Sequence, residues 1–453
     1  MRLGLLDRYD ARVPRYTSYP TANHFGPEVG ADSYRAWLGA LPPGETLSLY
    51  LHVPFCTKLC WYCGCHTTIV HDYAAVASYR YLLLREIDLV ADAIPDRHGV
   101  SHIHWGGGTP TLLTPEDFAA ICARLRDRFG FLPGIQASVE IDPRGFTREL
   151  AARMAREGVT RASLGVQDFD PAVQRAVNRI QSYETTARAV EWLRAEGIGD
   201  LNIDLIYGLP HQTPDSVAAT VDRALTLEPR QVALFGYAHV PWLKRHQRLL
   251  DEHALPGTRA RWALYWAAAT RLMGHGLVPV GLDHFAAPGS ALATAAAARD
   301  LHRNFQGYTT DDAGTILGFG ASAIGTLPQG YVQNAAKIAQ YRDAIAEGRL
   351  ATVRGKTVTA DDRLRRDVIS QLMCNLRADV GAICEAHGRG AEALDREIAG
   401  LAPLEADGIA AVAGRQVTVA EDARPLVRSV CAVFDAYYDS GAADIEPRHA
   451  KAV

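Results

Sequence analysis

Short apolar runs rich in β-branched and aromatic residues alternate with amphipathic stretches from about residue 47 to residue 325. The runs that favour strands cover 47–53, 102–107, 137–142, 161–166, 201–208, 231–237, 277–281 and 315–320. The stretches between them have helical spacing, and several end in glycine, as a helix C-terminus should. This alternation predicts parallel βα units, which form an open sheet or a full or partial barrel with its active site at the carboxyl ends of the strands.

The two ends of the chain lack this alternation. Residues 1–45 show no clear periodicity and are rich in Tyr, Pro and polar residues, so we expect an arm or lid. The patterns after about residue 360 are helical, apart from a run at 409–419 that is typical of a small hairpin. We therefore expect an α/β barrel domain over 46–350 and a mainly helical C-terminal domain over 351–453.

Composition and charge exclude several classes of protein. The 453 residues include 47 Lys and Arg against 51 Asp and Glu, a formal net charge of −4. This balance does not support nucleic acid as a partner, because coating a phosphate backbone requires a basic excess. No run of about 18 apolar residues predicts a membrane span, and the charged N-terminus lacks the apolar region of a secretory signal. We expect a cytoplasmic protein.

The cysteines are distributed unevenly. Four of the eight fall within ten residues, Cys56, Cys60, Cys63 and Cys65, whereas Cys122, Cys374, Cys384 and Cys431 are single and predicted to be small buried residues. The C-x3-C-x2-C spacing follows directly on the strand expected at 47–53. Three such thiolates suit a [4Fe–4S] cluster whose fourth iron stays open. A structural zinc site, with Cys65 or His66 as fourth ligand, is the alternative from spacing alone.

Two further segments carry polar groups at predicted strand ends. HWGGGTPT (104–111) places three glycines after a strand, where free N–H groups could receive a carboxylate, although a tight turn without a ligand would have the same pattern. In ASVEIDPR, Glu140 and Asp142 share one face of a strand near its end. Carboxylates there suit ribose hydroxyls, and the alternative is a solvated strand end or a salt bridge.

The cysteine spacing resembles the signature of the radical S-adenosylmethionine superfamily, with Tyr62 as the aromatic residue before the third cysteine. Further segments resemble the oxygen-independent coproporphyrinogen III oxidases: PRYTSYPT (14–21), LYLHVPFCTKLCWYCGC (49–65), HWGGGTPT (104–111), NIDLIYGLP (202–210), GLDHFA (281–286) and LHRNFQGYTT (301–310). The resemblance covers nearly the whole chain. It implies a partial (βα) TIM-like barrel. Cys65 is also oxidase-like, because the related haem chaperones usually have Phe there.

The resemblance also implies the cofactors and their ligands. Cys56, Cys60 and Cys63 would hold a [4Fe–4S] cluster, and Cys65 would not be a ligand. One S-adenosylmethionine, bound to the cluster, would contact Tyr50, Gly107, Gly108, Thr109, Glu140 and Ile324. A second one would lie against Tyr62, Gly108, Thr109, Gln167, Arg179, Asp204 and Ala238. Tyr62 replaces the Phe often found there, and Gly236 stands where some relatives have Asn.

The implied reaction is the oxidative decarboxylation of two propionates of coproporphyrinogen III to vinyl groups by a 5′-deoxyadenosyl radical, giving protoporphyrinogen IX in haem biosynthesis. Arg15 and Arg303 are candidates to bind the propionates, because arginine pairs with carboxylates in a bidentate manner. No catalytic side chain is assigned, although Cys65 is a candidate. A reductant or electron-donor protein is an expected partner of the monomer. The alternatives are a haem chaperone, a radical tetrapyrrole methyltransferase and a zinc-stabilised module that is not an enzyme.

Overall fold

A computed structural model of the chain describes residues 6–438. Residues 1–5 of the expected arm and 439–453 of the expected C-terminal domain lie outside the described residues. Among the described residues, no helix is both long enough and apolar enough to cross a membrane.

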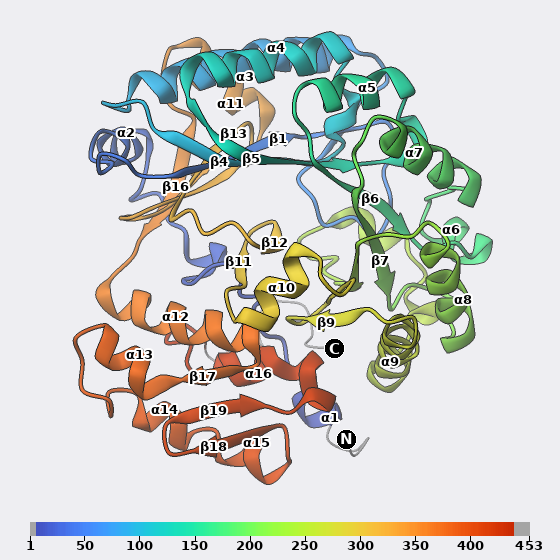
Figure 1. The fold of residues 1–453 in the computed structure, drawn as a ribbon, viewed down its shortest axis with the longest axis vertical. Coiled ribbons are helices and arrows are strands. Elements are labelled where there is room, and N and C mark those ends of the chain that lie inside the picture. Colours follow the sequence, from blue (N-terminus) through green and yellow to red (C-terminus); the bar gives the residue numbers. More distant parts are fainter. Residues whose placement is uncertain (1–5, 439–453) are drawn as a thin grey trace.

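The centre of the molecule is one open sheet of twelve strands, in the order β16-β15-β14-β13-β1-β4-β5-β6-β7-β8-β10-β9 (Figure 1). Seven neighbouring strands are parallel. They are β13 (Thr315–Phe319), β1 (Leu47–Val53), β4 (Gly99–Gly107), β5 (Gly130–Ile141), β6 (Arg161–Gln167), β7 (Asp200–Tyr207) and β8 (Gln231–Gly236). The two ends of the sheet do not pair, so the partial barrel expected from the sequence is confirmed.

Both edges of the sheet are antiparallel, which the alternating pattern did not predict. The run at 277–281 forms only β9 (Val278–Val280), which turns directly into β10 (His284–Ala286), and β10 pairs antiparallel with β8. So short a connection cannot make the crossover that a parallel strand requires. At the other edge, β14 (Ile324–Leu327), β15 (Gly330–Asn334) and β16 (Thr352–Thr357) extend the sheet past β13. The sheet thus continues beyond residue 350, where the sequence pattern ended the barrel.

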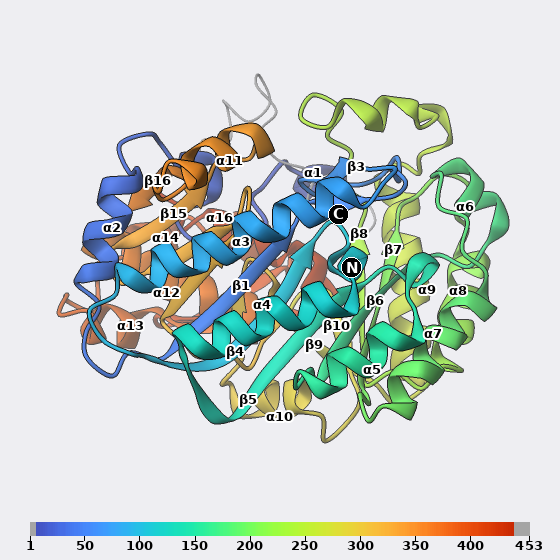
Figure 2. The same cartoon turned by 90° about the horizontal axis from the view of Figure 1, so that it is seen from above.

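Helices cover the outer face of the sheet, and capping side chains define where many of them begin. Thr114, Thr147, Ser182 and Thr213 each accept a backbone N–H bond at a helix start. Figure 1 shows α3, α4, α5, α7 and α8 along one side of the sheet, and Figure 2 shows them from above. The helices of the barrel are α3 (Ala74–Asp92), α4 (Pro115–Arg128), α5 (Arg148–Arg156), α6 (Pro171–Ala176), α7 (Tyr183–Ala195), α8 (Pro214–Leu225), α9 (Thr258–Gly274), α10 (Ala291–Ala298) and α11 (Ile338–Ala346).

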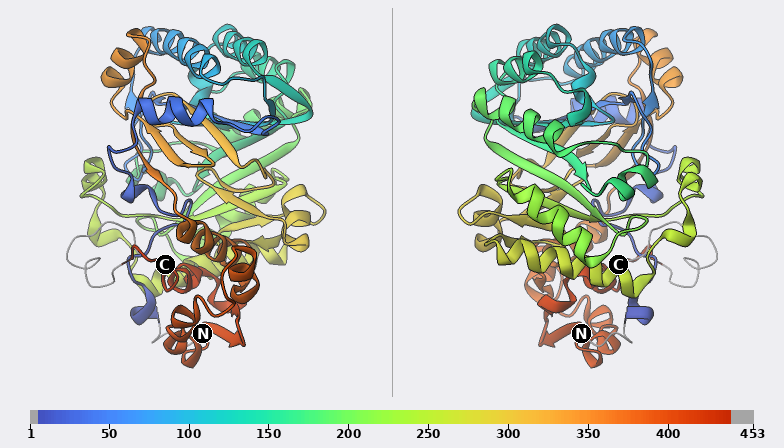
Figure 3. Two further views of the ribbon diagram at one scale, coloured as in Figure 1. Left: turned by 90° about the vertical axis from the view of Figure 1, so that its left-hand side faces the viewer. Right: turned by 90° about the vertical axis from the view of Figure 1, so that its right-hand side faces the viewer.

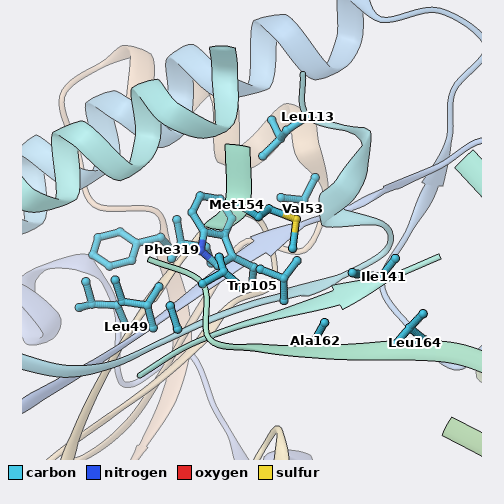
Figure 4. Close-up of a cluster of buried hydrophobic side chains, with 14 of the residues drawn as sticks. Leu49, Val53, Trp105, Leu113, Ile141, Met154, Ala162, Leu164 and Phe319 are labelled. Atoms are coloured by element: carbon cyan, nitrogen blue, oxygen red, sulfur yellow. The ribbon is translucent and has the colours of Figure 1, made fainter. Parts of the chain in front are cut away.

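The main core lies between these helices and the parallel strands. Six of the seven residues of β1 are buried, as expected for a strand that is covered on both faces. Figure 4 shows Leu49 and Val53 of β1, Trp105 of β4 and Met154 of α5 packed together beneath the helices. Apolar contacts fill the outer face of the sheet. Polar side chains of the parallel strands lie at the carboxyl ends of those strands.

The C-terminal region has a second core. It contains α12 (Ala360–Asn375), α13 (Val380–Ala386), α14 (Asp395–Ala399), α15 (Ala402–Ala406), α16 (Val427–Ala432) and a small sheet of β17 (Arg377–Asp379), β18 (Ala410–Ala413) and β19 (Gln416–Val419). The hairpin expected at 409–419 is confirmed as β18 and β19. Figure 3 shows this region at one end of the molecule, below the main sheet.

The N-terminal segment is divided between the two cores. Val13, Tyr16 and Tyr19 are buried in the C-terminal core, where the Tyr16 hydroxyl donates to Asp435 over 3.1 Å. Residues Ala31–Gly39 instead form a helix, α2, whose Tyr34 and Leu38 pack into the barrel core. The segment also contains the short helix α1 (Leu6–Tyr9). The absence of periodicity inferred for residues 1–45 was therefore wrong for α2, a helix of nine residues without a side-chain cap.

Candidate active site

The cysteine loop is fastened to the carboxyl end of β1. Directly after β1, the short strand β2 (Phe55–Cys56) pairs in parallel with β3 (Thr68–Ile69), and the loop with Cys60 and Cys63 lies between them. All eight cysteines are unpaired. The single ones, Cys122, Cys374, Cys384 and Cys431, are buried as expected, whereas Cys65 is exposed.

Hydroxyl and guanidinium groups of nearby side chains donate hydrogen bonds to two of the three thiols, Cys56 and Cys60. The hydroxyls of Thr67 and Thr109 donate to Cys56 Sγ over 3.2 and 3.3 Å. The guanidinium groups of Arg144 and Arg179 approach Cys60 Sγ at 3.6 and 3.5 Å. Donors and positive charge stabilise sulfur in the thiolate form that binds metals.

The surroundings of Cys63 favour its thiolate form. A hydrogen bond from the Cys65 thiol, assisted by the nearby charges of Lys244 and Arg179, lowers the pKa of Cys63 to about 6. Burial raises the pKa of Cys56. The backbone N–H of Cys65 also donates to Cys63 Sγ over 3.4 Å, so Cys65 supports its neighbour.

The arrangement of the thiols bears on which metal they suit. Zinc in a tetrahedral site is surrounded by its ligands, with sulfur atoms about 2.3 Å from the ion. Over residues 6–438, no three His, Cys, Asp or Glu side chains converge on such a point. Cys56, Cys60 and Cys63 all line one cavity. Three thiols facing one cavity suit an iron–sulfur cluster with an open iron.

The glycine turn after β4 passes directly beneath the cysteine loop. A Cβ atom at Gly108 would lie 2.6 Å from the Phe55 carbonyl oxygen and 2.7 Å from Thr67 Oγ1. Gly107 has a φ of 114°, and a Cβ there would lie 2.8 Å from the His52 ring. Only glycine fits both positions, so the glycines serve a close approach of backbone and cysteine loop. The N–H of Gly107 donates to Glu140 Oε2 over 3.2 Å.

Glu140 lies at the centre of a polar group in the barrel. Its Oε1 is 3.2 Å from His104 Nε2, and the His104 ring stacks on Tyr50 with centroids 5.9 Å apart. Glu140 faces both cavities of the barrel interior. Its carboxylate is therefore available to a ligand in either one.

Asp142, left without a role by the sequence analysis, forms an ion cluster beside Cys60. Its carboxylate is 2.5 Å from Arg144 and 3.4 Å from Arg179. Burial alone would raise the pKa of Asp142, but the charges of Arg179 and Arg144 hold it at about 2. Asp142 thus fixes two guanidinium groups against the sulfur. The sequence analysis missed Arg144, whose only signal was its place two residues after Asp142 at a strand end.

Two further predicted residues lie at the ends of β6 and β7. Gln167 ends β6 with a φ of 72°, a strained conformation for a residue with a side chain, and such strain often marks a functional site. Asp204 on β7 accepts hydrogen bonds from Ser163 over 3.1 Å and Asn202 over 2.7 Å. Burial, together with the negative charge of Glu140, raises the pKa of Asp204 to about 6.

These groups line a cavity of about 170 Å³. It brings together twelve of the residues predicted from the sequence: Cys56, Cys60, Cys63, Cys65, Tyr62, Gly107, Gly108, Thr109, Glu140, Gln167, Arg179 and Asp204. A second cavity of about 290 Å³ shares Cys65, Glu140, Ser163 and Asp204 with the first and also contains Tyr50. The two cavities therefore adjoin within the barrel.

Four predicted residues line neither of these cavities. Ile324 begins β14 and packs against Gly318, the partner of Tyr50 in the sheet. Ala238 follows β8, and its carbonyl accepts a hydrogen bond from Gln247 over 3.2 Å. Arg15 donates to the Gly236 carbonyl over 3.0 Å, and Arg303 approaches the Arg15 carbonyl at 3.5 Å. These two arginines lie together where the N-terminal segment meets β8.

Three side chains that bind the cysteine loop have no signal in the sequence. Lys244, His246 and Gln247 hydrogen-bond the carbonyl oxygens of Cys65, Cys63 and Tyr62 over 3.0, 2.7 and 3.0 Å. No motif marks these residues. They come from a distant part of the chain that only folding brings to the loop.

Comparison with known proteins agrees with this geometry. Residues 50–224 match the model of the radical SAM superfamily. The chain is 53% identical over 442 residues to the oxygen-independent coproporphyrinogen III oxidase of Bradyrhizobium diazoefficiens, covering 97% of this chain and 98% of that one. It is 39% identical to the enzyme of the same name from Escherichia coli, covering 96% and 95%. The solved structure of coproporphyrinogen III oxidase from Escherichia coli, described as a radical SAM enzyme, superposes with a TM-score of 0.90 at 37% identity, over 96% of this chain and 99% of that one.

The fold and the cysteine loop therefore define a radical SAM enzyme. The cofactors of this superfamily are a [4Fe–4S] cluster and S-adenosylmethionine. Within it, the chain belongs to the oxygen-independent coproporphyrinogen III oxidases.

Proposed function

We propose that this protein oxidises coproporphyrinogen III to protoporphyrinogen IX without oxygen, in haem biosynthesis. The observation that carries the proposal is the convergence of three cysteine thiols, a glycine turn and Glu140 on one cavity, in a chain whose relatives have that activity by name. When bound, the cluster and S-adenosylmethionine supply a 5′-deoxyadenosyl radical. Each of two propionates then loses one hydrogen atom, one carbon dioxide and one electron, which leaves a vinyl group.

The chain's own part is to hold and orient the cofactors. Cys56, Cys60 and Cys63 would hold the cluster, and the glycine turn lets the backbone pass close to the cysteine loop. A first S-adenosylmethionine would contact Tyr50, Gly107, Gly108, Thr109, Glu140 and Ile324. A second one would contact Tyr62, Gly108, Thr109, Gln167, Arg179, Asp204 and Ala238.

Arg15 and Arg303 serve as anchors for the substrate's propionates. The Arg303 guanidinium lies 4.4 Å from the centre of the Tyr308 ring, and its Nε and one terminal nitrogen are buried without a hydrogen-bond acceptor in the described part of the chain. Buried donors without acceptors are costly unless a ligand satisfies them. A carboxylate supplies two acceptors in the geometry of a guanidinium.

The proposal includes the conditions under which the enzyme works. A cluster held by thiolates needs a reducing compartment, so we place the enzyme in the cytoplasm, as a monomer. Cys65 remains the candidate for a side chain that acts on the substrate, because it lines the second cavity and is exposed. One electron must also reach the cluster from a reductant.

An anaerobic turnover assay tests the proposal. Reconstituted protein receives coproporphyrinogen III, S-adenosylmethionine and a strong reductant, and the products are identified by mass. Stepwise loss of two carboxyl groups together with 5′-deoxyadenosine is the expected result, and Cys60→Ala is the inactive control. Formation of 5′-deoxyadenosine without a decarboxylated tetrapyrrole would show that the substrate is wrong. Tight haem binding in that case would favour the haem chaperone, and S-adenosylhomocysteine would favour the methyltransferase.

A further inference from the structure

The segment 238–250 after β8 lies against the cysteine loop. Figure 2 shows it in yellow-green, standing out from the body of the molecule near β3. Three of its side chains bond to loop carbonyls, and the bond from His246 reaches Cys63, one of the three cluster cysteines. On its inner side, Leu250 packs with Tyr237 in a small core against which Trp61 and Tyr62 of the loop also pack. The segment is therefore a fixed part of the surface around the cluster.

The outer side of this segment is basic. Segment 238–250 contains Lys244, Arg245 and Arg248 and no Asp or Glu, and the cysteine loop over 54–71 contains Lys58 and no Asp or Glu. Lys58, Arg245 and Arg248 are exposed, and none of them forms an ion pair within residues 6–438. The whole chain has a formal net charge of −4, so this local excess of positive charge is a distinct feature.

The same segment exposes large apolar side chains. Trp242, Leu243 and Leu249 keep 36%, 63% and 57% of their area exposed. Single exposed leucines are ordinary, but here three large apolar residues of one short segment lie among unpaired cations. Apolar residues surrounded by charge are typical of protein-binding surfaces. We call Lys58, Trp242, Leu243, Arg245, Arg248 and Leu249 the cluster-side patch.

We propose that the cluster-side patch is the docking surface for an acidic protein that donates single electrons to the cluster. The inference rests on the proposed function, because only a redox-active cluster needs such a donor. In this step the donor is oxidised by one electron and the cluster is reduced by one, and no bond forms or breaks. Electron transfer between proteins requires close approach, and the patch belongs to the segment that directly contacts the cysteine loop.

The chemistry of the patch suits this kind of partner. Redox partners form small, transient interfaces that must release after each transfer. In such complexes opposite charges raise the association rate and make it sensitive to salt. Positive charge around the cluster selects a donor whose own surface is acidic near its redox group. A tetrapyrrole with carboxylates would also be attracted to positive charge, so the test must separate the two.

Binding of the donor in its oxidised form, which has no electron to give, provides a direct test. The probe is an oxidised flavodoxin, an acidic flavoprotein, and its dissociation constant is measured by titration against the reconstituted holoenzyme. The double variant Arg245→Glu/Arg248→Glu should bind the probe about tenfold more weakly or worse, with a flatter dependence on salt. Leu249→Ser should weaken binding while leaving the charge unchanged. Arg188→Glu, at an exposed arginine on the outer helix α7, is the matched control and should bind as the wild type does.

Reduction of the cluster gives the second readout. Reduced flavodoxin should reduce the cluster of the double variant more slowly by the same factor, whereas photoreduced deazariboflavin, which is small and uncharged, should reduce both proteins equally. Unchanged affinity for flavodoxin in both patch variants would overturn the proposal. Weaker binding of coproporphyrin III by the patch variants, with unchanged donor binding, would also overturn the proposal, because the patch would then bind the substrate. A wild type that holds iron and cleaves S-adenosylmethionine but binds no flavodoxin would overturn the docking surface alone, whereas a wild type without iron would overturn the proposed function.

Discussion

The carboxyl edge of the parallel sheet and the core of the C-terminal region differ in the kind of side chain that lines their interior. At the sheet edge, thiols, carboxylates and guanidinium groups surround cavities of about 170 and 290 Å³. In the C-terminal core, apolar side chains such as Val368, Leu372 and Phe434 are completely buried. The first region places polar groups against cavities, whereas the second is filled by apolar side chains.

This difference shows how the molecule separates chemistry from support. The sheet edge holds Asp142 and Arg179 in a buried ion cluster, an arrangement that contributes little net stability but fixes charge beside a thiol. The C-terminal core gathers Val13, Tyr16 and Tyr19 of the N-terminal segment and so holds Arg15, next to Tyr16 in the chain, close to the end of β8. Apolar burial therefore supplies the stability that positions the polar groups.

The largest expected effect is loss of the cluster from the sheet edge. Cys56→Ala, Cys60→Ala and Cys63→Ala should each abolish cluster binding, because three thiolates hold three irons. Iron content and the visible absorption after reconstitution measure this. Cys65→Ala should keep its iron, and Cys122→Ala, at a buried cysteine of α4, is the matched control. Loss of iron from Cys65→Ala would overturn the ligand assignment.

The opposite result is expected in the C-terminal core. Phe434 is completely buried, so Phe434→Ala should lower the free energy of unfolding by about 3–5 kcal/mol. Chemical denaturation followed by fluorescence measures the loss. Iron content after reconstitution should stay at the wild-type level. If Phe434→Ala lost iron as Cys60→Ala does, the two regions would not be separable.

Glu86 extends the comparison, because it is a buried carboxyl group that protein donors, and no proposed ligand, contact. On α3 it accepts hydrogen bonds from the Gly320 N–H, Asn334 and the Tyr341 hydroxyl, over 2.6, 2.6 and 2.7 Å. Burial raises the pKa of Glu86 to about 7, because these donors offset only part of the desolvation. The other titratable groups facing it are tyrosines, Tyr34 of α2 and Tyr79 of α3.

The raised pKa has a definite sign for stability. The folded state keeps the proton of Glu86 up to a higher pH than the unfolded state, so the wild type loses stability as pH rises from about 4.5 to about 7. Glu86→Gln cannot titrate. Its free energy of unfolding relative to the wild type should therefore rise across this window, by at most about 3 kcal/mol. Denaturation of both proteins at each pH measures the difference, and a constant difference would contradict the prediction.

The smallest expected effect concerns the glycine turn. Gly108→Ala pushes a methyl group into the Phe55 carbonyl and Thr67, so the cysteine loop must shift. Binding of S-adenosylmethionine to the reconstituted protein should weaken about tenfold, which is about 1.4 kcal/mol. Calorimetric titration measures this. Gly199→Ala is the matched control, because a Cβ there meets no atom within 4 Å. Equal affinity in the two variants would show that the close packing has no role in binding.

The sequence predicted the parallel strands well, because each is a continuous apolar run bounded by turns. It predicted β1 over its whole length, and it placed β6 and β8 to within one residue. It did not predict β14, β15 and β16, whose glycines at 325, 330 and 355 are typical of turns. These short strands form because they pair with each other and with β13, which is not visible in local spacing.

Within the site, the sequence predicted the residues of local motifs but not the residues that come from distant parts of the chain. The spacing of Cys56, Cys60 and Cys63 and the glycine turn are contiguous in the chain, so the sequence itself contains them. Arg144 was missed because its contact with Cys60 spans 84 residues of chain. His246 was missed for the same reason, since 183 residues separate it from Cys63.

The sequence by itself predicted the parallel strands, their alternation with helices and the polar residues that stand at the strand ends. These follow from periodicity and spacing, which act over a few residues. Only the tertiary structure decided which distant charges stand beside each thiol, how the two cavities adjoin and which residues make the surface around the cluster. Burial and electrostatic shifts depend on the neighbours that packing brings together, and those neighbours come from every part of the chain.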